Sequence, residues 1–249
     1  MDITNKRVVI TGAASGFGKA IALDLLAQKA KVATLDVNEK MLQQFKDEQP
    51  GIFPLQCDVT NTVQVDECIV KVMEQWKGID VLINNAGIMK NAPLINLLNR
   101  KDRKHSLELW QKVIDINQTG VFNMARSVAE QMVLKRNKGV IINISSIAAQ
   151  GNIGQTAYSA SKAAVEAMSK VWSKELGRFG IRSVAIAPGF MDTAGTAEAI
   201  EEKMLKQWIE KTPLRRTGSI DEVVSCVNFV LNNDFINGET INVNGGLTV

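Results

Sequence analysis

The sequence predicts a single α/β domain over residues 1–249, in which helices cover both faces of one parallel β-sheet. Short apolar segments such as Arg7 to Thr11 alternate with stretches of helical spacing, the first of which contains Ile21 and Leu25. Strands that alternate with helices in this way pair in parallel through right-handed crossovers, which place helices on both sides of the sheet. Because no linker, repeat or low-complexity tract divides the chain, one doubly wound, Rossmann-type sheet is expected.

The elements are expected in a regular order along the chain. Strands are predicted over residues 7–11, 31–36, up to Cys57, 79–83, 138–144, 181–187 and 240–243. Helices are predicted after the glycine-rich turn at 12–18, over 39–48, 63–76, 107–136 with an interruption around 118–120, 156–179, and after Asp221. The irregular segment 188–213 encloses a short amphipathic helix. Residues 88–106 are polar, basic and rich in Asn, which predicts a loop.

Composition is that of an ordinary soluble globular protein. Apolar residues make up 45% and charged residues 22% of the 249 residues. The 29 lysines and arginines exceed the 26 acids by only +3, which argues against binding to nucleic acid or to a membrane surface. No apolar run reaches the roughly 18 residues that span a bilayer. The first residues lead directly into a strand and leave no room for a signal peptide, so a cytoplasmic location is expected.

Cysteine and histidine usage excludes several kinds of chemistry. Cys57, Cys68 and Cys226 are odd in number and far apart, with no Cys-x-x-Cys pair, so neither a disulfide framework nor a thiolate metal site is predicted. His105 is the only histidine, which excludes Ser-His-Asp hydrolysis and most zinc chemistry. Any chemistry must therefore use Tyr, Lys, Ser, Asn, carboxylates or a cofactor, and no metal is expected.

One pair of residues suggests a device for proton transfer. Tyr158, the only tyrosine, and Lys162 stand at i and i+4 on a predicted helix, which places a phenol beside an ammonium. A nearby positive charge favours the phenolate, so the tyrosine can exchange a proton closer to neutral pH than a free phenol does. Taken alone, the same spacing also fits an ordinary helix surface.

The first turn has the composition of a dinucleotide site. Gly12, Gly16 and Gly18 follow the first strand and open a helix, where backbone N–H groups can approach a pyrophosphate. Asp36 closes the second strand, and a carboxylate there can bond both ribose hydroxyls of NAD while repelling the 2′-phosphate of NADP. No basic residue stands at Ser15 or Val37. NAD(H) is therefore expected in preference to NADP(H), although Asp36 could also cap the following helix.

These motifs resemble those of the short-chain dehydrogenase/reductase family over nearly the whole chain. The matching residues are Thr-Gly-x-x-x-Gly-x-Gly at 11–18, Asn-Asn-Ala-Gly at 84–87, Asn117, Ser145, the pair Tyr158 and Lys162, and Pro188-Gly189 with Thr193. Ser145 precedes the tyrosine by 13 residues. The C-terminal third resembles the 3-oxoacyl-carrier-protein reductases of the family, whereas the long polar loop before Leu107 is more similar to its 3-hydroxyacyl-CoA dehydrogenases.

The resemblance implies a set of catalytic roles. Tyr158 would be the general acid/base at the substrate oxygen, and Lys162 would lower the pKa of Tyr158 and bond the nicotinamide ribose. Ser145 would donate a hydrogen bond to the same oxygen, with Ser146 as the alternative that only the spacing disfavours. Asn117 would hold a water that links Lys162 to solvent.

The resemblance also implies further cofactor contacts at the carboxyl ends of the strands. Asp58 with Val59 resembles an adenine-binding pair, although Asp58 or Thr60 could instead cap the next helix. The full set of implied cofactor-binding residues is Gly12, Ser15, Gly16, Phe17, Gly18, Asp36, Val37, Asp58, Val59, Asn85, Ala86, Gly87, Tyr158, Lys162, Pro188, Gly189, Met191 and Thr193.

The substrate is expected to be a ketone or secondary alcohol with hydrophobic character. The helix within 190–213 resembles a substrate lid of the family, and its apolar side carries Ile200, Met204, Leu205, Trp208 and Ile209. A 3-hydroxyacyl or 3-oxoacyl thioester of coenzyme A or a carrier protein is favoured, and another hydrophobic secondary alcohol is the alternative. The reductase branch usually uses NADPH and carries a basic residue where Ser15 stands, which weakens a biosynthetic assignment.

Three expectations concern the protein's wider behaviour. The cluster Lys90, Arg100, Lys101, Arg103, Lys104 and His105, opposed only by Asp102, is either a solvated loop or a landing place for phosphates. The family implies a homotetramer built through the helices at 107–136 and 156–179. A non-catalytic protein that merely binds the cofactor is the alternative to an enzyme, and the presence of Tyr158 and Lys162 argues against it.

Overall fold

Seven strands form one parallel sheet in the computed structural model, which describes residues 1–99, 102–192 and 202–249 except for the side chains of 202–205. The strands are β1 (Arg7–Thr11), β2 (Lys31–Asp36), β3 (Phe53–Gln56), β4 (Val81–Asn84), β5 (Gly139–Ile144), β6 (Ile181–Pro188) and β7 (Thr240–Val243). Their order is β3-β2-β1-β4-β5-β6-β7, and every neighbouring pair is parallel. The predicted doubly wound α/β fold is thereby confirmed.

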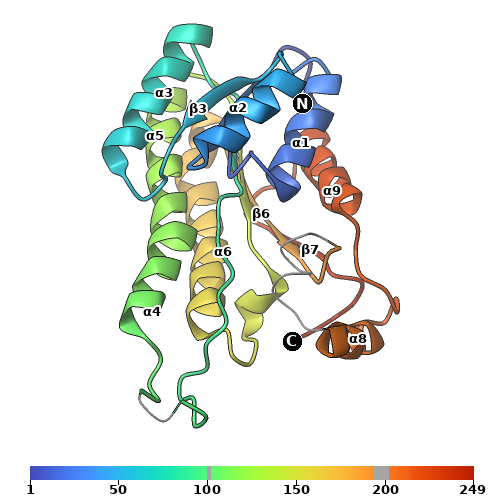
Figure 1. Ribbon diagram of the computed structural model, residues 1–249. Helices are drawn as coiled ribbons and strands as arrows, with labels where there is room; N and C mark the ends of the chain where they lie inside the picture. Colours follow the sequence, from blue (N-terminus) through green and yellow to red (C-terminus); the bar gives the residue numbers. More distant parts are fainter. Residues whose placement is uncertain (100–101, 193–201) are drawn as a thin grey trace.

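Helices cover both faces of this sheet, as Figure 1 shows. Helices α1 (Gly16–Ala27) and α9 (Ile220–Asn232) pack on one face, while α3 (Thr62–Trp76), α5 (Gly120–Leu134) and α6 (Thr156–Leu176) pack on the other. The remaining helical segments are α2 (Glu39–Glu48), α4 (Leu107–Ile114), a π-helix (Asp115–Thr119), two 3₁₀ turns (Ile147–Gln150 and Gly177–Phe179) and α8 (Glu202–Lys211). None of the helices in the described part of the chain is long and apolar enough to cross a membrane.

The two faces explain why the strands read as continuous apolar runs. Successive residues of a strand point to opposite faces, so both positions are buried when helices cover both sides. In β1, Val8 and Ile10 join the core on the side of α1 and α9, whereas Val9 joins the core on the side of α3, α5 and α6. In β5, Ile142 and Ile141 divide in the same way. The parity of a residue therefore decides which helices its side chain meets.

Helix caps differ from the sequence-based alternatives. The N-cap of α3 is Asn61, whose side chain accepts from the backbone of Val63 and Gln64, so neither Asp58 nor Thr60 caps this helix. The N-cap of α2 is Asn38 rather than Asp36. Because Asn38 and Asn61 already accept hydrogen bonds from the first N–H groups of these helices, neither Asp36 nor Asp58 is needed as a cap.

The long helix predicted over 107–136 is interrupted, as expected, but earlier and in a specific way. Helix α4 ends at Ile114, the π-helix Asp115–Thr119 follows, and α5 begins at Gly120. A π-helix inserts one extra residue into a turn and is found mostly at functional sites. Here the interruption contains Asn117, which is completely buried.

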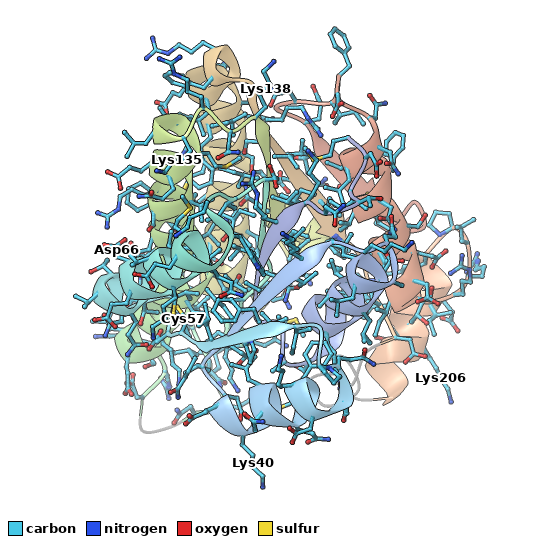
Figure 2. All side chains as sticks on the ribbon, turned by 90° about the horizontal axis from the view of Figure 1, so that it is seen from above. Lys40, Cys57, Asp66, Lys135, Lys138 and Lys206 are labelled. Carbon is cyan, nitrogen blue, oxygen red and sulfur yellow. The ribbon has the colours of Figure 1, made fainter. Side chains whose placement is uncertain are left out.

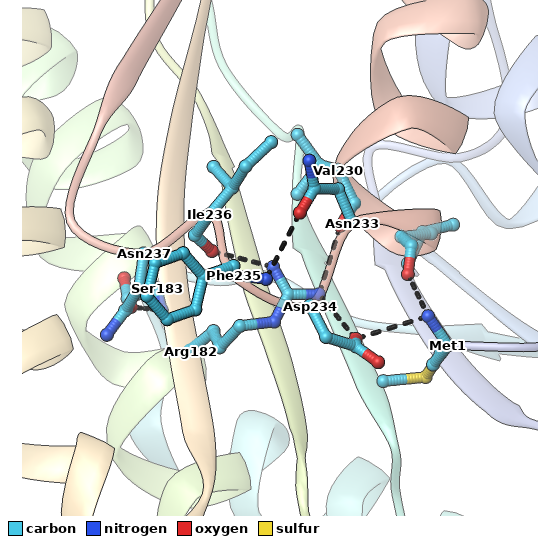
Figure 3. Close-up of polar contacts among 10 residues, drawn as sticks. Met1, Arg182, Ser183, Val230, Asn233, Asp234, Phe235, Ile236 and Asn237 are labelled. Carbon is cyan, nitrogen blue, oxygen red and sulfur yellow. Dashed lines mark hydrogen bonds and ion pairs between the residues drawn. The ribbon is translucent and has the colours of Figure 1, made fainter.

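A buried arginine fixes the C-terminal half of the sheet (Figure 3). Arg182 on β6 donates hydrogen bonds to the carbonyl oxygens of Ile236 (2.8 Å) and Val230 (3.0 Å), and its guanidinium lies 3.4 Å from the Asp234 carboxylate. The N-terminal amine of Met1 pairs with the same carboxylate at 3.1 Å. This cluster joins β6, α9, the segment before β7 and the N-terminus, and so supports the strand that ends at Pro188.

The order of the strands reverses between β1 and β4, because the chain runs outward through β2 and β3 and then returns to the other side of β1. Open α/β sheets bind ligands at the carboxyl ends of the strands beside such a point. The predicted lid is described only in part: α8 covers Glu202–Lys211, while Thr193, Ile200 and the side chains of Met204 and Leu205 lie outside the described residues.

Candidate active site

The glycine turn is held against the end of β4 by a dense set of hydrogen bonds. Thr11 Oγ1 accepts from the backbone N–H groups of Asn85 and Ala86, both at 3.0 Å, and Asn85 Nδ2 donates to the carbonyls of Thr11 and Gly12. Gly12 has φ +61, and a Cβ there would lie 2.8 Å from Ala86 Cα. A Cβ on Gly18 would lie 2.3 Å from Gly12 O. Packing therefore requires glycine at both positions.

The third glycine leaves the mouth of this turn open. A Cβ added to Gly16, at φ +52, would meet nothing within 4 Å, although the positive φ itself favours glycine. N-cap Ser15 makes no side-chain cap hydrogen bond, so it does not supply an acceptor to the first backbone N–H groups of α1. Unpaired donors at a helix N-terminus suit a phosphate. The turn thus fits the pyrophosphate of a dinucleotide.

A cavity of about 940 Å³ extends from this turn across the ends of β2, β3 and β4. Most of the predicted cofactor-binding residues on the N-terminal half of the sheet line it together, namely Gly12, Ser15, Gly16, Phe17, Asp36, Val37, Asp58, Val59, Asn85, Ala86 and Gly87. Gly18 does not line it and contributes through packing alone. The concave, mixed polar and apolar lining is suitable for the adenosine half of a dinucleotide.

Asp36 lies in this cavity with its carboxylate held in place. One carboxylate oxygen accepts from Ala14 N at 3.0 Å and the other from Asn38 N at 3.0 Å. Each oxygen keeps a lone pair for a hydroxyl group. The nearby Lys40 is exposed, and Figure 2 shows its side chain projecting outward from α2. The negative charge of Asp36 thus faces the cavity in a fixed orientation.

A second cavity, of about 690 Å³, begins where the first one ends and shares Phe17, Asn85, Gly87 and Ile88 with it. Helix α6 contributes Tyr158 and Lys162 to its lining, and the predicted residues Pro188, Gly189 and Met191 line the opposite side. Thr193 lies outside the described residues. The glycine turn at residues 12–18 and the pair of Tyr158 and Lys162 therefore lie along one connected cavity.

Lys162 is buried, and its ammonium lies near the Tyr158 ring. Its Nζ donates to Ile144 O at 2.7 Å and lies 5.8 Å from the centre of the Tyr158 ring. Burial lowers the pKa of Lys162 to about 8. Gly87 leaves room for Asn117, because a Cβ there would lie only 3.2 Å from Asn117 Oδ1, whereas its 3.6 Å distance to Lys162 Nζ is an ordinary contact.

The pKa of Tyr158 differs from the expectation that Lys162 lowers it. Burial raises the pKa of the phenol, and a hydrogen bond with the Ser146 side chain lowers it in part. Lys162 does not reach the hydroxyl because its ammonium is bonded to Ile144 O. The raised pKa of Tyr158 favours the neutral phenol, which is the form that donates a proton.

Ser146, rather than the favoured Ser145, stands beside the phenol. Ser145 is 3% exposed, and its single hydroxyl proton is shared between Glu166 Oε1 at 2.9 Å and Lys162 O at 3.2 Å, both on α6. Ser145 has the parity of Ile141, which faces that helix. Ser146 follows the end of β5 and turns its hydroxyl to Tyr158. The spacing of 13 residues therefore selected the wrong neighbour of the pair.

Asn117 occupies the π-helix and is turned toward the backbone after β4. Its amide donates to Ile88 O at 2.9 Å and to Ser161 Oγ at 3.3 Å, and its Oδ1 accepts from Ile88 N at 2.8 Å. Asn117 does not line either cavity. Its side chain ties the loop after β4 to α6, which is a positioning role; the predicted water link to Lys162 stays a prediction.

An aromatic stack closes the cavity on the side of α8. The rings of Phe190 and Trp208 lie 4.8 Å apart at 26°, and Lys211 Nζ lies 4.8 Å from the Trp208 ring. Phe190 and Met191 also line the cavity. Helix α8 therefore packs an aromatic side chain against the substrate end of the site, consistent with an apolar wall there.

The basic loop divides into residues with different surroundings. Lys90 lines the cavity, and Arg103 and Lys104 are exposed, while Arg100 and Lys101 lie outside the described residues. His105 turns inward instead: both ring nitrogens are buried without a hydrogen-bond partner, and the ring packs edge-on against Trp110 at 6.4 Å and 85°. The histidine is thus part of the loop's packing and not of a charged surface.

Sequence reasoning missed three carboxamides that line the substrate cavity, Asn91, Asn152 and Gln155. Gln155 stands at i−3 from Tyr158, so helical spacing could have indicated it. No signal in the sequence brings together Asn91 and Asn152, since each lies in a separate loop. Within the described ranges, no cluster of three or more His, Cys, Asp or Glu residues is arranged to hold a metal ion.

Comparison with known proteins agrees with this geometry. A family model described as "Enoyl-(Acyl carrier protein) reductase" matches residues 12–248. The chain is 38% identical to the 3-oxoacyl-[acyl-carrier-protein] reductase FabG of Thermotoga maritima, with 100% of both chains covered. It is 34% identical to the sorbitol-6-phosphate 2-dehydrogenase of Klebsiella pneumoniae, covering 100% of this chain and 98% of that one. The crystal structure of gox2181 is 30% identical and matches with a TM-score of 0.89 over 98% of this chain and 95% of that chain. The chain therefore belongs to the short-chain dehydrogenase/reductase family of oxidoreductases.

Proposed function

We propose that this protein is an NAD(H)-dependent oxidoreductase that interconverts a secondary alcohol and a ketone. The observation that carries the proposal is the hydrogen-bonded pair of Tyr158 and Ser146 in a cavity that is continuous with the glycine turn and Asp36. A nicotinamide cofactor supplies the hydride in ketone reduction and accepts it in alcohol oxidation. The protein must then place the substrate oxygen and transfer one proton.

Three side chains perform that proton transfer. The Tyr158 hydroxyl donates its proton to the substrate oxygen in ketone reduction and recovers one in alcohol oxidation. Ser146 donates a hydrogen bond to the same oxygen as negative charge develops there. Lys162 bonds Ile144 O in this state, 5.8 Å from the ring centre, and is proposed to stabilise the phenolate through its charge once the proton has left. Burial of both groups strengthens this interaction because little water screens it.

The preference for NAD(H) rests on Asp36. Its carboxylate is held by Ala14 N and Asn38 N and faces the adenosine cavity. The two oxygens suit the two ribose hydroxyls, and their charge opposes a 2′-phosphate. Titration of NADH and NADPH by protein fluorescence tests this assignment directly, and tighter binding of NADPH would refute it.

The substrate proposed is a 3-hydroxyacyl or 3-oxoacyl thioester. The relative from Thermotoga maritima is a 3-oxoacyl-[acyl-carrier-protein] reductase, and the cavity has an apolar side formed by Met89, Phe190 and Met191. An NAD-linked dehydrogenase of another hydrophobic secondary alcohol is the second candidate. A screen of NADH consumption with 3-oxoacyl thioesters and with cyclic and aliphatic ketones distinguishes the two.

The Tyr158→Phe variant tests the proposed chemistry. Removal of one oxygen leaves the ring, the helix and the cofactor cavity in place, so the variant should bind NADH as the wild type does. Turnover of the ketone found in the screen should fall about 10²- to 10⁴-fold. Turnover close to that of the wild type would sink the proton-transfer assignment. A purely cofactor-binding protein would show NADH binding and no turnover in either form.

The protein is further proposed to work as a cytoplasmic homotetramer. Phe122 on α5 and Val171 on α6 expose 45% and 50% of their surface, and exposed apolar side chains on long helices are typical of subunit contacts. Sedimentation equilibrium tests this proposal, since a monomer at micromolar concentration would contradict it. Phe122→Glu and Val171→Glu would then be expected to weaken the assembly.

A further inference from the structure

One wall of the substrate cavity is built from linked carboxamides. Gln155 Nε2 donates to Asn91 Oδ1 at 2.9 Å, and Asn152 Nδ2 donates to Gln155 Oε1 at 3.1 Å. All three residues line the same cavity as Tyr158 and Ser146. Gln155 precedes Tyr158 by one helical turn, so the wall and the phenol belong to one helix end.

Backbone contacts hold this wall rigid. Ala92 N donates to Gly154 O at 2.7 Å, which joins the loop after β4 to the loop before α6. Asn152 N donates to Ser159 Oγ at 3.2 Å, and Gln155 N donates to Asn152 O at 3.1 Å. Gln155 itself is 7% exposed. The two asparagines are therefore ordered before a ligand arrives, which lowers the entropic cost of binding.

The chain of amides leaves one amide nitrogen and one amide oxygen with no hydrogen-bond partner among the described residues. Gln155 uses one end of its amide on each asparagine, so Asn91 keeps its Nδ2 and Asn152 keeps its Oδ1, neither of which has a partner within the described residues. If all three amides were turned over, Asn91 would keep the acceptor and Asn152 the donor. In both directions an unused N–H donor and an unused C=O acceptor remain on residues that line the cavity.

The rest of the cavity lining is mixed. Met89, Phe190 and Met191 supply apolar surface, and Lys90 and Asn85 add polar groups. A purely hydrocarbon substituent lying on the amide wall would displace water and leave the polar groups of the wall unpaired, which disfavours binding. The cavity therefore combines apolar surface with hydrogen-bonding groups.

We infer that Asn91 and Asn152, held together by Gln155, select ketones that carry a second oxygen function close to the reacting carbon, such as the thioester carbonyl of a 3-oxoacyl compound. The inference rests on the proposed function and adds the residues that read the substrate. Asn91 or Asn152 would donate to the second oxygen, while Tyr158 and Ser146 bond the first. Gln155 acts as the positioning residue that fixes both asparagines.

A matched pair of substrates isolates this contact. S-acetoacetyl-N-acetylcysteamine has two carbonyls, and S-(3-oxobutyl)-N-acetylcysteamine has CH₂ in place of the thioester carbonyl and is otherwise the same. The full-length wild type, Asn91→Leu and Asn152→Leu are assayed with NADH on both compounds. Gln150→Leu is the matched control, since Gln150 is exposed and does not line the cavity.

The expected result is a change in selectivity. The ratio of kcat/KM for the thioester to kcat/KM for the thioether should fall about tenfold to hundredfold in either asparagine variant, mainly through KM, while Gln150→Leu keeps the wild-type ratio. Gln155→Leu should lower the ratio too, because it frees both asparagines. An unchanged ratio in Asn91→Leu and in Asn152→Leu overturns the inference and leaves the proposed function standing.

A binding measurement tests the amide wall even if the wild type reduces neither compound. Calorimetric titration of both compounds in the presence of NAD⁺, which cannot reduce them, reports the affinity alone. If the wild type reduces neither compound, the proposed function fails for this substrate class. Tighter wild-type binding of the thioester than of the thioether, lost in Asn152→Leu, would still support the amide wall, and equal binding of the two compounds would overturn it.

Discussion

The assignment of Ser146 leads to a prediction with a built-in comparison. Ser146→Ala removes a hydroxyl that interacts with Tyr158, and loss of one donor to a developing oxyanion typically costs about 10²- to 10³-fold in kcat. Ser145→Ala removes a hydroxyl that is bonded to Glu166 at 2.9 Å and to Lys162 O at 3.2 Å instead. Its kcat should stay within about threefold of the wild type, while the free energy of unfolding should fall by about 1–2 kcal/mol because two acceptors lose their partner.

Both variants are assayed together under the same conditions. Single-turnover reduction of the ketone by NADH gives the rate of the chemical step, and urea denaturation gives the free energy of unfolding. The reasoning predicts a kinetic defect in Ser146→Ala and a stability defect in Ser145→Ala. The reverse pattern, with Ser145→Ala kinetically impaired and Ser146→Ala active, would show that the hydroxyl beside the phenol is not the one that serves the reaction.

Three further predictions concern charge. Folded Lys162 loses its proton near pH 8 and the unfolded lysine near its ordinary pKa of 10.5, so the unfolded state binds more protons between these values and the free energy of unfolding rises with pH there. This rise is at most about 1.4 kcal/mol per pH unit, and Lys162→Met should abolish it. Urea titrations at pH 7.5 and 9.5 measure the change in the free energy of unfolding with pH, and an equal change in both proteins would contradict the prediction. Asp36→Ser should weaken NADH binding and lower the ratio of the affinity for NADH to the affinity for NADPH about tenfold, because the repulsive carboxylate is gone. An unaltered ratio would exclude Asp36 as the cause of the cofactor preference. Arg182→Met leaves the carbonyls of Ile236 and Val230 without their donor and should lower the free energy of unfolding by about 2–4 kcal/mol, measured by denaturation; a loss below about 0.5 kcal/mol would show that the cluster is dispensable.

The sequence predicts the scaffold better than the orientation of single side chains. The strand at 240–243 has the bounds that the sequence predicts, because alternation of polar and apolar residues before two glycines is typical of a strand that ends in a turn. The fourth strand begins later than expected, at Val81. Ile79 is still completely buried, so apolar character alone does not mark where the ladder of hydrogen bonds begins.

The two serines illustrate the limit for the site. Ser145 and Ser146 are adjacent, and both hydroxyls are compatible with the chemistry. Adjacent residues at a strand end face opposite sides of the sheet. A count of 13 residues back from Tyr158 therefore selects the wrong serine if the loop between β5 and α6 is one residue shorter than the count assumes. The loop between them and α6 is irregular, and its length follows from packing that no local pattern encodes.

The amide wall and the lysine contact show a second limit. Asn91 and Asn152 belong to loops that are far apart in the sequence and meet through Gln155. Lys162 was expected to serve the phenol, but its ammonium bonds to Ile144 O. Spacing along a helix identifies candidate partners, whereas the partner actually chosen depends on which acceptors the neighbouring strand presents. Such choices are tertiary and require coordinates.

The π-helix at Asp115–Thr119 has a consequence for how the chain tolerates changes in length. The wide π turn takes up one residue more than an α turn, so deletion of one residue from this segment would convert it to regular α-helix and remove the bulge that contains Asn117. Asn117 would then leave Ile88 and Ser161, its partners in the structure. Substitutions elsewhere on α4 and α5 change one contact at a time. A single-residue deletion here would remove the bulge and all the contacts of Asn117 together, which makes the residue count between α4 and α5 as restrictive as any side chain in the site.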